Sequence, residues 1–477
     1  MTGVHYSRKA MLYCSGMHKP FPPAPPLRKL IGPSFLILAL GLGSGEVILW
    51  PYLAANHGLV LAWGALAGIT FQYFVNMEIE RYALVKGESV FVGIGKRWKG
   101  APAWFILSTF VGFGLPGIIA ASASVVASLL HVADMRFVAI PMLLVIGLIL
   151  SAGHTVYGVM ERLTKTVILL GVPFIFALAV IMATGADWVE LGRGLVGFAG
   201  GGPLIPEGVA LATFLAAFAY SGAGGNLNLT QSIYVKEKGY GMAAYSEKMA
   251  GLFTAMGASA KLRLAGQTFE DTPEARGAFK VWWRRVSVEH AVVFWFTGAL
   301  SILTLMLLSY AATRGSDGNA QGIQFVLNEG TAIGGRLGPW AGLAFLAAVG
   351  VMLFQTQLGV MDSTSRIMAE NLAVAYTRFT GKDEIRLSRT YFSFLWAQIA
   401  FGIILFLLGQ TEPKTLLVLG ACLNAVAMFV HIGLVARLNR SELPVAYQAP
   451  AWRRALLWGI FLFFGYFSAV VLWDQLL

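Results

Sequence analysis

Apolar residues fill long stretches of this chain and recur in runs of about 20 residues. Helices of that length span a bilayer because they satisfy their own backbone hydrogen bonds within lipid. Eleven such runs predict an all-α polytopic membrane protein with eleven transmembrane helices. Their centres lie near Gly43, Ala67, Gly117, Val145, Phe174, Leu215, Ser301, Val351, Ala400, Ala425 and Leu462.

Charge refines this picture. Only 12% of the 477 residues are charged, against about 25% in soluble proteins. With a cytoplasmic N-terminus, only Arg136, Arg193, Arg314, Arg336 and Lys414 of the 35 Lys and Arg residues fall outside, as the positive-inside rule requires. The net charge of +11 then reflects topology and contact with an anionic lipid bilayer, and no nucleic-acid partner is implied. We expect an integral protein of a bacterial inner (plasma) membrane, with its C-terminus outside.

The domain organisation follows from these runs. Residues 1–27, which are rich in proline, are expected to form a disordered cytoplasmic tail. Residues 28–437 form the transmembrane core, in two inverted repeats over about 28–185 and 205–437, with a cytoplasmic loop at 235–286. Residues 438–477 supply the eleventh helix and the C-terminus.

Helix 1 carries three glycines and one acid near the middle of the membrane, in Gly41-Leu42-Gly43-Ser44-Gly45-Glu46. Closely spaced glycines favour an unwound segment, whose exposed carbonyls survive in a membrane only when they line a cavity. A charged group at this depth costs about 2.5–3.5 kcal/mol and is a functional-site hypothesis by default. Glu46 is therefore the leading candidate, although it could instead cap the half-helix that begins near Val47.

Helix 6 repeats the device. Two matched interruptions indicate a five-plus-five inverted repeat, the leucine-transporter fold, in which both broken helices meet at a central substrate site. The expected site residues of helix 6 are Tyr220, Ser221, Ala223, Gly224, Gly225, Asn226 and Asn228.

Helices 8 and 10 add polar groups. Gln355 is expected at the substrate site, and Gln357 and Asp362 along a path to the cytoplasm, since Gln355 and Asp362 share one helix face. Asp362 could equally pair with Arg366 one turn later. Asn424, at mid-span in helix 10, is assigned to the pathway and is suited to satisfy the carbonyls of a broken neighbour.

At the two breaks the chain resembles the NRAMP family of divalent-metal transporters, which has the leucine-transporter fold. The family's Asp-Pro-Gly-Asn motif falls on Gly43 to Glu46, and its Met-Pro-His-Asn-Leu motif falls on Ala223 to Leu227. The segments Arg81 to Gly87 and Tyr157 to Arg162 are also similar to the family. The resemblance covers most of the chain and implies transport of a metal ion.

Departures from the family motifs limit what the resemblance implies. The family's aspartate and methionine ligands correspond to Gly43 and Ala223, so its site for transition metals is not intact. Glu46 and Asn226 would remain as metal ligands, with hard oxygen donors suited to Mg or Mn. Helix 3 has no acid from Trp104 to Leu130, and a glycine replaces the family's helix 6 histidine, so proton coupling of the family kind is not expected.

A second resemblance keeps an alternative open. Gly43-Ser44-Gly45 with Pro51, and Phe218 to Gly222, are similar to motifs of amino-acid permeases of the same fold. These imply an amino-acid or amine substrate. A channel or receptor is a third possibility. No metalloprotease, CxxC or P-loop pattern occurs, so we do not expect an enzyme. We also expect no cofactor, and a divalent cation would be the substrate.

Overall fold

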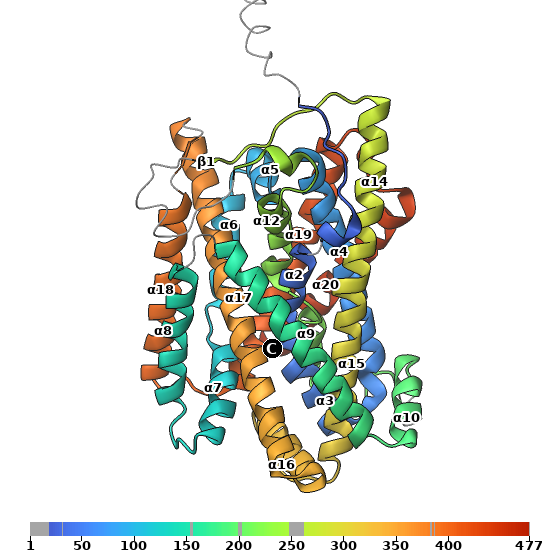
Figure 1. Cartoon of the computed structure of the whole chain (residues 1–477), viewed down its shortest axis with the longest axis vertical. Helices are drawn as coiled ribbons and strands as arrows, with labels where there is room; N and C mark the ends of the chain where they lie inside the picture. The colour runs from blue at the N-terminus through green and yellow to red at the C-terminus, as the bar shows by residue number, and fades with distance from the viewer. Residues whose placement is uncertain are drawn as a thin grey trace, which may run out of the picture.

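The computed structural model describes residues 19–30, 32–152, 156–198, 203–247, 262–381, 384–385 and 387–476. Within this part of the chain the protein is a helical bundle (Figure 1). Its one sheet is a short antiparallel pair, β1 (Leu262–Arg263) with β2 (Glu384–Ile385).

The first half of the chain, up to the second predicted break, contains twelve of the described elements and their short connecting turns. They are η1 (Leu27–Lys29), α2 (Pro33–Gly41), η2 (Gly45–Leu49), α3 (Trp50–His57), η3 (Leu59–Leu61), α4 (Ala62–Lys86), α5 (Val90–Arg97), α6 (Ala101–Phe113), α7 (Gly117–Leu129), α8 (Arg136–Ala152), α9 (Val156–Met182) and α10 (Gly185–Leu195).

The second half continues with the pieces of helix 6 and the long helices that follow. They are α11 (Leu211–Ala219), η5 (Gly225–Leu229), α12 (Thr230–Lys238), η6 (Gly241–Tyr245), α14 (Pro273–His290), η7 (Ala291–Phe296), α15 (Thr297–Thr313), α16 (Gln324–Leu337), α17 (Pro339–Thr380), α18 (Leu387–Leu407), α19 (Pro413–Glu442), η8 (Val445–Tyr447) and α20 (Ala451–Leu476).

Eight helices in the described residues are long and apolar enough to cross a membrane, or nine if the bent pair α2 with η2–α3 counts as one span. This supports an integral membrane protein. The predicted centres Val145 and Leu215 fall on α8 and α11, which are shorter than the other candidates. The count of eleven and the inverted repeat stay predictions.

Local sequence explains where several helices begin. Thr272 caps α14 by accepting a hydrogen bond from the Ala275 amide at 3.2 Å, and Pro273 occupies the first turn. Glu412 caps α19 in the same way through the Thr415 amide at 2.6 Å. These caps satisfy amides that would otherwise lack partners where the chain enters the bundle.

The broken helices lie in the middle of the bundle. The first half of helix 1, α2, packs against α9, α12 and α17, while α11 packs against α4, α19 and η2. The 42-residue helix α17 crosses the whole bundle and also contacts α6, α7, α16 and α18 (Figure 1). Long intact helices therefore hold the short broken ones in place.

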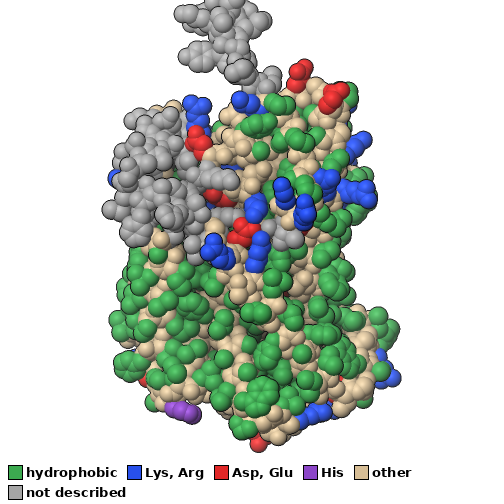
Figure 2. All heavy atoms as spheres, in the orientation of Figure 1, with side chains coloured by type: hydrophobic (Ala, Val, Ile, Leu, Met, Phe, Trp, Pro, Cys, Tyr) green, Lys and Arg blue, Asp and Glu red, His purple; other side chains and the backbone are tan. Residues whose placement is uncertain are grey.

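Basic side chains gather at one end of the molecule, which we call the basic end. It contains the segment that starts at Lys19, together with α5 and α14 (Figure 2). Figure 2 shows most of the visible Lys and Arg side chains at this end, above a broad apolar belt. Residues 21 and 22, which belong to the predicted N-terminal tail, contact the bundle. Phe21 is buried against Phe279 and Tyr447, and Trp282 donates to the Pro22 carbonyl at 2.8 Å. An apolar pocket beside α14 thus holds the last part of the predicted tail.

Candidate functional site

Helix 1 is interrupted where its glycines predict. The α-helix ends at Gly41, and after Ser44 the chain resumes as the single π turn η2, with a bend of 41°. A Cβ atom on Gly45 would lie 1.8 Å from the Tyr220 carbonyl oxygen, and one on Gly41 would lie 2.6 Å from the Gly222 backbone. The glycines therefore allow the two breaks to touch.

Gly43 faces a different neighbour, α17. A Cβ atom on Gly43 would lie 2.5 Å from the Thr356 side chain. The Thr356 hydroxyl donates to the Ala39 carbonyl at 3.0 Å, which gives this carbonyl of the interrupted helix a partner. Thr356 thus fills the space that a side chain at position 43 would need.

Helix 6 is interrupted after Ala219, again as predicted. Gly222, Gly224 and Gly225 have φ angles of 141°, 70° and 51°, in the left-handed region that L side chains rarely adopt. The helix then restarts as η5 and α12. These glycines serve both backbone conformation and close packing, whereas those of helix 1 serve close packing alone.

Gln72 of α4 holds the helix 6 break together, and the sequence analysis did not single it out. Its amide group donates to the Ala219 carbonyl at 2.8 Å, and its oxygen accepts from the Gly224 amide at 3.1 Å and from Asn228 Nδ2 at 3.1 Å. Asn228 Nδ2 also donates to Asn76 at 2.7 Å. Polar residues every fourth position in an apolar span (Gln72, Asn76, Glu80) were the available signal.

Glu46 lies on η2, which packs against α11 and α15. It is fully buried, and neither of its carboxylate oxygens has a hydrogen-bond partner in the described structure. A buried, unpartnered carboxylate is costly and rare. This is the most unusual polar group at the breaks.

Glu46 and Asn226, the two expected metal ligands, do not hydrogen-bond each other in the described structure. Asn226 Nδ2 donates to Ser108 at 2.8 Å and to Thr109 at 3.0 Å, both on α6, while its Oδ1 has no partner. Within the described residues no group of three or more His, Cys, Asp or Glu is placed to hold a metal ion. The assignment of these two residues as metal ligands stays a prediction.

Other predicted site residues of helix 6 contact the scaffold. The Ser221 hydroxyl accepts from Trp50 Nε1 at 2.8 Å and donates to the Ala217 carbonyl at 3.0 Å. The Tyr220 ring stacks on Phe113, with ring centroids 6.0 Å apart. Ala223 is buried. These residues fix the shape of the break.

Asn424 has the role that its mid-span position suggested. Its amide group donates to the Gly112 carbonyl at 2.8 Å and to the Tyr220 hydroxyl at 2.9 Å. Gly112 lies four residues before Pro116, which has no N–H group to bond that carbonyl. Asn424 thus repairs an interruption between α6 and α7 and ties it to helix 6; the sequence analysis missed this third break.

The glutamines of α17 are buried, as expected for a site in the bundle. Gln355 Nε2 donates to Thr164 of α9 at 3.1 Å, and its oxygen has no partner. Gln357 is also buried. Asp362 pairs with Arg366, which was the alternative to a role in the pathway. Arg366 Nε donates to both of its carboxylate oxygens, at 2.8 and 3.0 Å.

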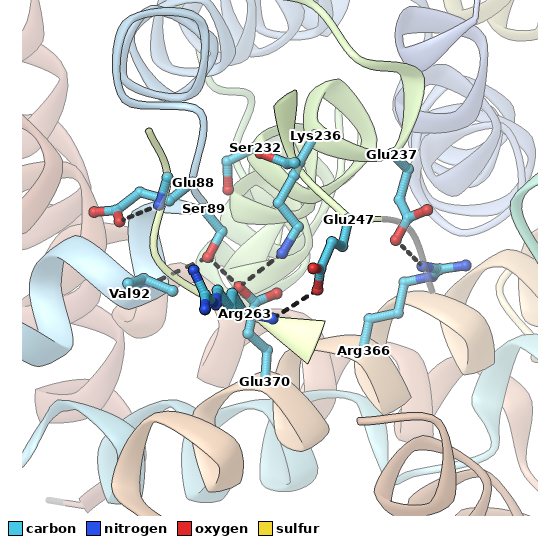
Figure 3. A network of polar contacts seen from close by, with 12 residues as sticks. Glu88, Ser89, Val92, Ser232, Lys236, Glu237, Glu247, Arg263, Arg366 and Glu370 are labelled. Carbon is cyan, nitrogen blue, oxygen red and sulfur yellow. Dashed lines mark hydrogen bonds and ion pairs between the residues drawn. The ribbon is translucent and has the colours of Figure 1, made fainter. Parts of the chain in front are cut away.

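The basic-end network is a set of buried polar residues that joins α12 to α17 and α18. Asp362 accepts from Tyr391 at 2.8 Å, and Arg366 also approaches Glu237 at 3.7 Å. Figure 3 shows two of the links between α12 and α17, Lys236 to Glu370 at 3.5 Å and Glu237 to Arg366. The network consists of Tyr234, Lys236, Glu237, Asp362, Ser363, Arg366, Glu370 and Tyr391.

Further buried acids escaped the sequence analysis. Glu80 accepts from Gln231 at 3.0 Å, and Glu289 of α14 bonds Ser34 at the start of α2. Both acids are buried. An acid within or just beside an apolar run was the signal, and it was visible at both positions.

Contacts also close the opposite end. Lys414 of α19 donates to the Tyr52 hydroxyl of α3 at 2.5 Å, and Asn56 donates to the Asn319 carbonyl at 3.3 Å. The second half of helix 1 is therefore fastened to its surroundings on the side away from the basic end. The two breaks are enclosed between polar contacts at both ends of the bundle.

No family model and no curated protein matches this sequence. Solved structures do match. A histidine-to-alanine mutant of the Eremococcus coleocola manganese transporter is similar with a TM-score of 0.66 and 13% identity, over 94% of this chain and 87% of that chain. The same transporter in complex with an aromatic bis-isothiourea substituted compound gives a TM-score of 0.65 and 13% identity, over 97% and 91%.

A third similar structure is Mhp1, a nucleobase-cation-symport-1 family transporter, in a closed conformation with bromovinylhydantoin bound. It matches with a TM-score of 0.51 and 12% identity, over 89% of this chain and 82% of that chain. At these identities the likeness concerns the fold. The chain has the fold of these transporters, which is the leucine-transporter fold that the two breaks predicted.

Proposed function

We propose that this protein is an NRAMP-like secondary transporter that moves a small cation across the membrane by alternating access, with Glu46 binding the positive charge of the substrate. One observation carries the proposal: Glu46 is a fully buried carboxylate with no partner, at the contact between two broken helices. A carboxylate in this state requires a proton or a cation. Similarity in fold to a manganese transporter supports the same class of substrate.

Other buried oxygens are suited to complete a cation site. Asn226 Oδ1, Gln355 Oε1 and Asn424 Oδ1 share the absence of a hydrogen-bond donor, although the other end of each amide is bonded. Amide oxygens are ligands for hard divalent ions such as Mg and Mn, which keep part of their water shell. We propose that they approach the substrate when the basic-end network opens.

The basic-end network is the proposed cytoplasmic gate. Its ion pairs join α12, the second half of helix 6, to α17, so access from that end requires them to separate. The contacts of Tyr52 and Asn56 would form the outer gate. Helix 3 supplies no acid, so this proposal includes no proton coupling of the family kind.

An amino-acid or amine substrate is the second candidate. It is favoured because, in the described residues, no group of three or more His, Cys, Asp or Glu side chains is placed to hold a divalent ion. A monovalent ammonium group would need only one carboxylate.

Reconstituted liposomes test both candidates. We expect uptake of Mn or Mg by the wild type, and a loss of at least about tenfold in Glu46→Gln, because an amide removes the charge that binds the cation. Glu274→Gln, which changes an exposed acid on α14, is the matched control and should transport normally. Uptake of amines without uptake of divalent ions would select the second candidate. Transport of every cation at the wild-type rate by Glu46→Gln would contradict the proposal.

A further inference from the structure

A cavity of about 780 Å³ opens between α19 and α20, away from the broken helices. We call it the α19–α20 cavity. The two helices are antiparallel neighbours, since α19 ends at Glu442 and α20 begins at Ala451 after the short turn that contains η8. Both helices therefore reach the basic end where they meet, and residues farther from that turn lie deeper in the apolar belt.

The deep part of the cavity is apolar. Leu434 of α19 and Leu457 and Phe461 of α20 line it, and Gly433 leaves room beside the Phe461 ring. Trp458 lies on the same wall and is 47% exposed, so this side of the cavity borders the lipid. These surroundings suit an acyl chain.

The shallow part is cationic. Arg437, Arg440 and Arg454 line it, and no carboxylate of the described residues forms an ion pair with them. Arg440 donates to Gln448 at 2.8 Å and Arg454 donates to the Ala449 carbonyl at 2.8 Å, so both guanidinium groups are held at the rim. Three guanidinium groups at one rim, two of them held by hydrogen bonds, suit a phosphate.

Nearby acids do not neutralise this cluster. Glu78 is the acidic residue among those that line the cavity, and Arg81 and Arg453 bond it at 2.7 and 3.0 Å. Glu442 pairs with Arg97 at 2.6 Å and with Lys86 at 3.6 Å. Each acid already has two cations.

We propose that the α19–α20 cavity binds one anionic phospholipid, with its phosphate among Arg437, Arg440 and Arg454 and an acyl chain beside Leu434 and Phe461. The cavity is cationic near the membrane surface and apolar deeper in the membrane. A phospholipid likewise has its phosphate near the surface and its acyl chains deeper. Basic pockets between transmembrane helices on the cytoplasmic side bind acidic headgroups by this chemistry. The bound lipid would join α20 to the transport core through α19.

Native mass spectrometry of the purified full-length protein tests this proposal with phosphatidylglycerol and phosphatidylcholine as the probes. We expect phosphatidylglycerol to bind at least about tenfold more tightly. The triple variant Arg437→Gln, Arg440→Gln and Arg454→Gln should lose that preference. The control triple variant Lys280→Gln, Arg284→Gln and Arg389→Gln removes the same charge from exposed positions elsewhere and should keep it.

Three results would overturn the proposal. They are equal binding of the two lipids by the wild type, unchanged preference in the cavity variant, and full competition by soluble glycerol phosphate, which would indicate a site for a free anion. If the triple variant does not fold, Arg437→Gln alone serves, because the described structure gives Arg437 no hydrogen bond to lose. That single variant should weaken phosphatidylglycerol binding severalfold.

Discussion

The contact between the two broken helices and the basic-end network are both buried, yet they treat charge in opposite ways. In the network Asp362 is bonded by Arg366 and Tyr391. At the breaks neither carboxylate oxygen of Glu46 has a hydrogen-bond partner among the residues that the structure describes. A buried charge with partners holds helices together, whereas one without partners destabilises the fold. The four predictions below test this difference, from the largest effect to the smallest.

Arg366→Ala should destabilise the protein most. It leaves Asp362 buried without its cation, which costs about 3–5 kcal/mol in free energy of unfolding. Denaturant titration in detergent micelles measures this loss. Arg284→Ala, at an exposed site on α14, is the control and should change the free energy by less than about 0.5 kcal/mol. Equal small effects for both variants would mean that the network does not support the fold.

Gly45→Ala should destabilise the protein by about 1–3 kcal/mol, because its Cβ atom would lie 1.8 Å from the Tyr220 carbonyl oxygen. We also expect transport to fall sharply, since the two breaks must separate to admit a methyl group. The control is Gly277→Ala in α14, where a Cβ atom would meet no atom within 4 Å. That change should be neutral or stabilising. A Gly45→Ala protein with wild-type stability would show that the breaks are not in tight contact.

Glu46→Gln should act in the opposite direction and stabilise the substrate-free protein by about 0.5–2 kcal/mol, although it abolishes transport. The reason is that an amide is cheaper to bury without partners than a carboxylate. Thermal unfolding of wild type and variant at equal detergent concentration gives the sign. A clear loss of stability would show that Glu46 has a structural role, as the capping hypothesis states.

Lys238→Ala should have the smallest effect. Lys238 follows Glu237 of the basic-end network and contacts Glu161 of α9 at 2.7 Å, but its side chain is 26% exposed. A partly exposed pair contributes about 0.2–1 kcal/mol, and salt screens it. The loss should therefore shrink in a titration repeated at 1 M salt. If Lys238→Ala lowered the free energy of unfolding as much as Arg366→Ala, the partly exposed pair would contribute as much as the buried network.

The positions of the two helix breaks were predictable from the sequence, and the polar contacts around them were much less so. Clusters of glycines predicted both helix interruptions. The depth of Glu46 in the membrane made it the leading candidate. Asn424 was predicted to bond a broken neighbour, and it does, but the break of helix 3 that it serves was missed. Gln72 was also missed because its role depends on α4 lying beside α11, a contact between residues 147 positions apart. Spacing along one helix gives no information about such partners.

The sequence by itself determined the membrane setting, the long helices and the places where two of them break, because these depend on local hydrophobicity and on the conformational freedom of glycine. The tertiary structure decided which polar groups are satisfied. Residues of α12, α17 and α18 supply the partners of Asp362. In the described residues, α11 and α15, which pack against η2, supply no hydrogen-bond partner for Glu46. The pairing of a buried charge thus depends on neighbouring helices as well as on its own, and it distinguishes the proposed gate from the proposed binding residue.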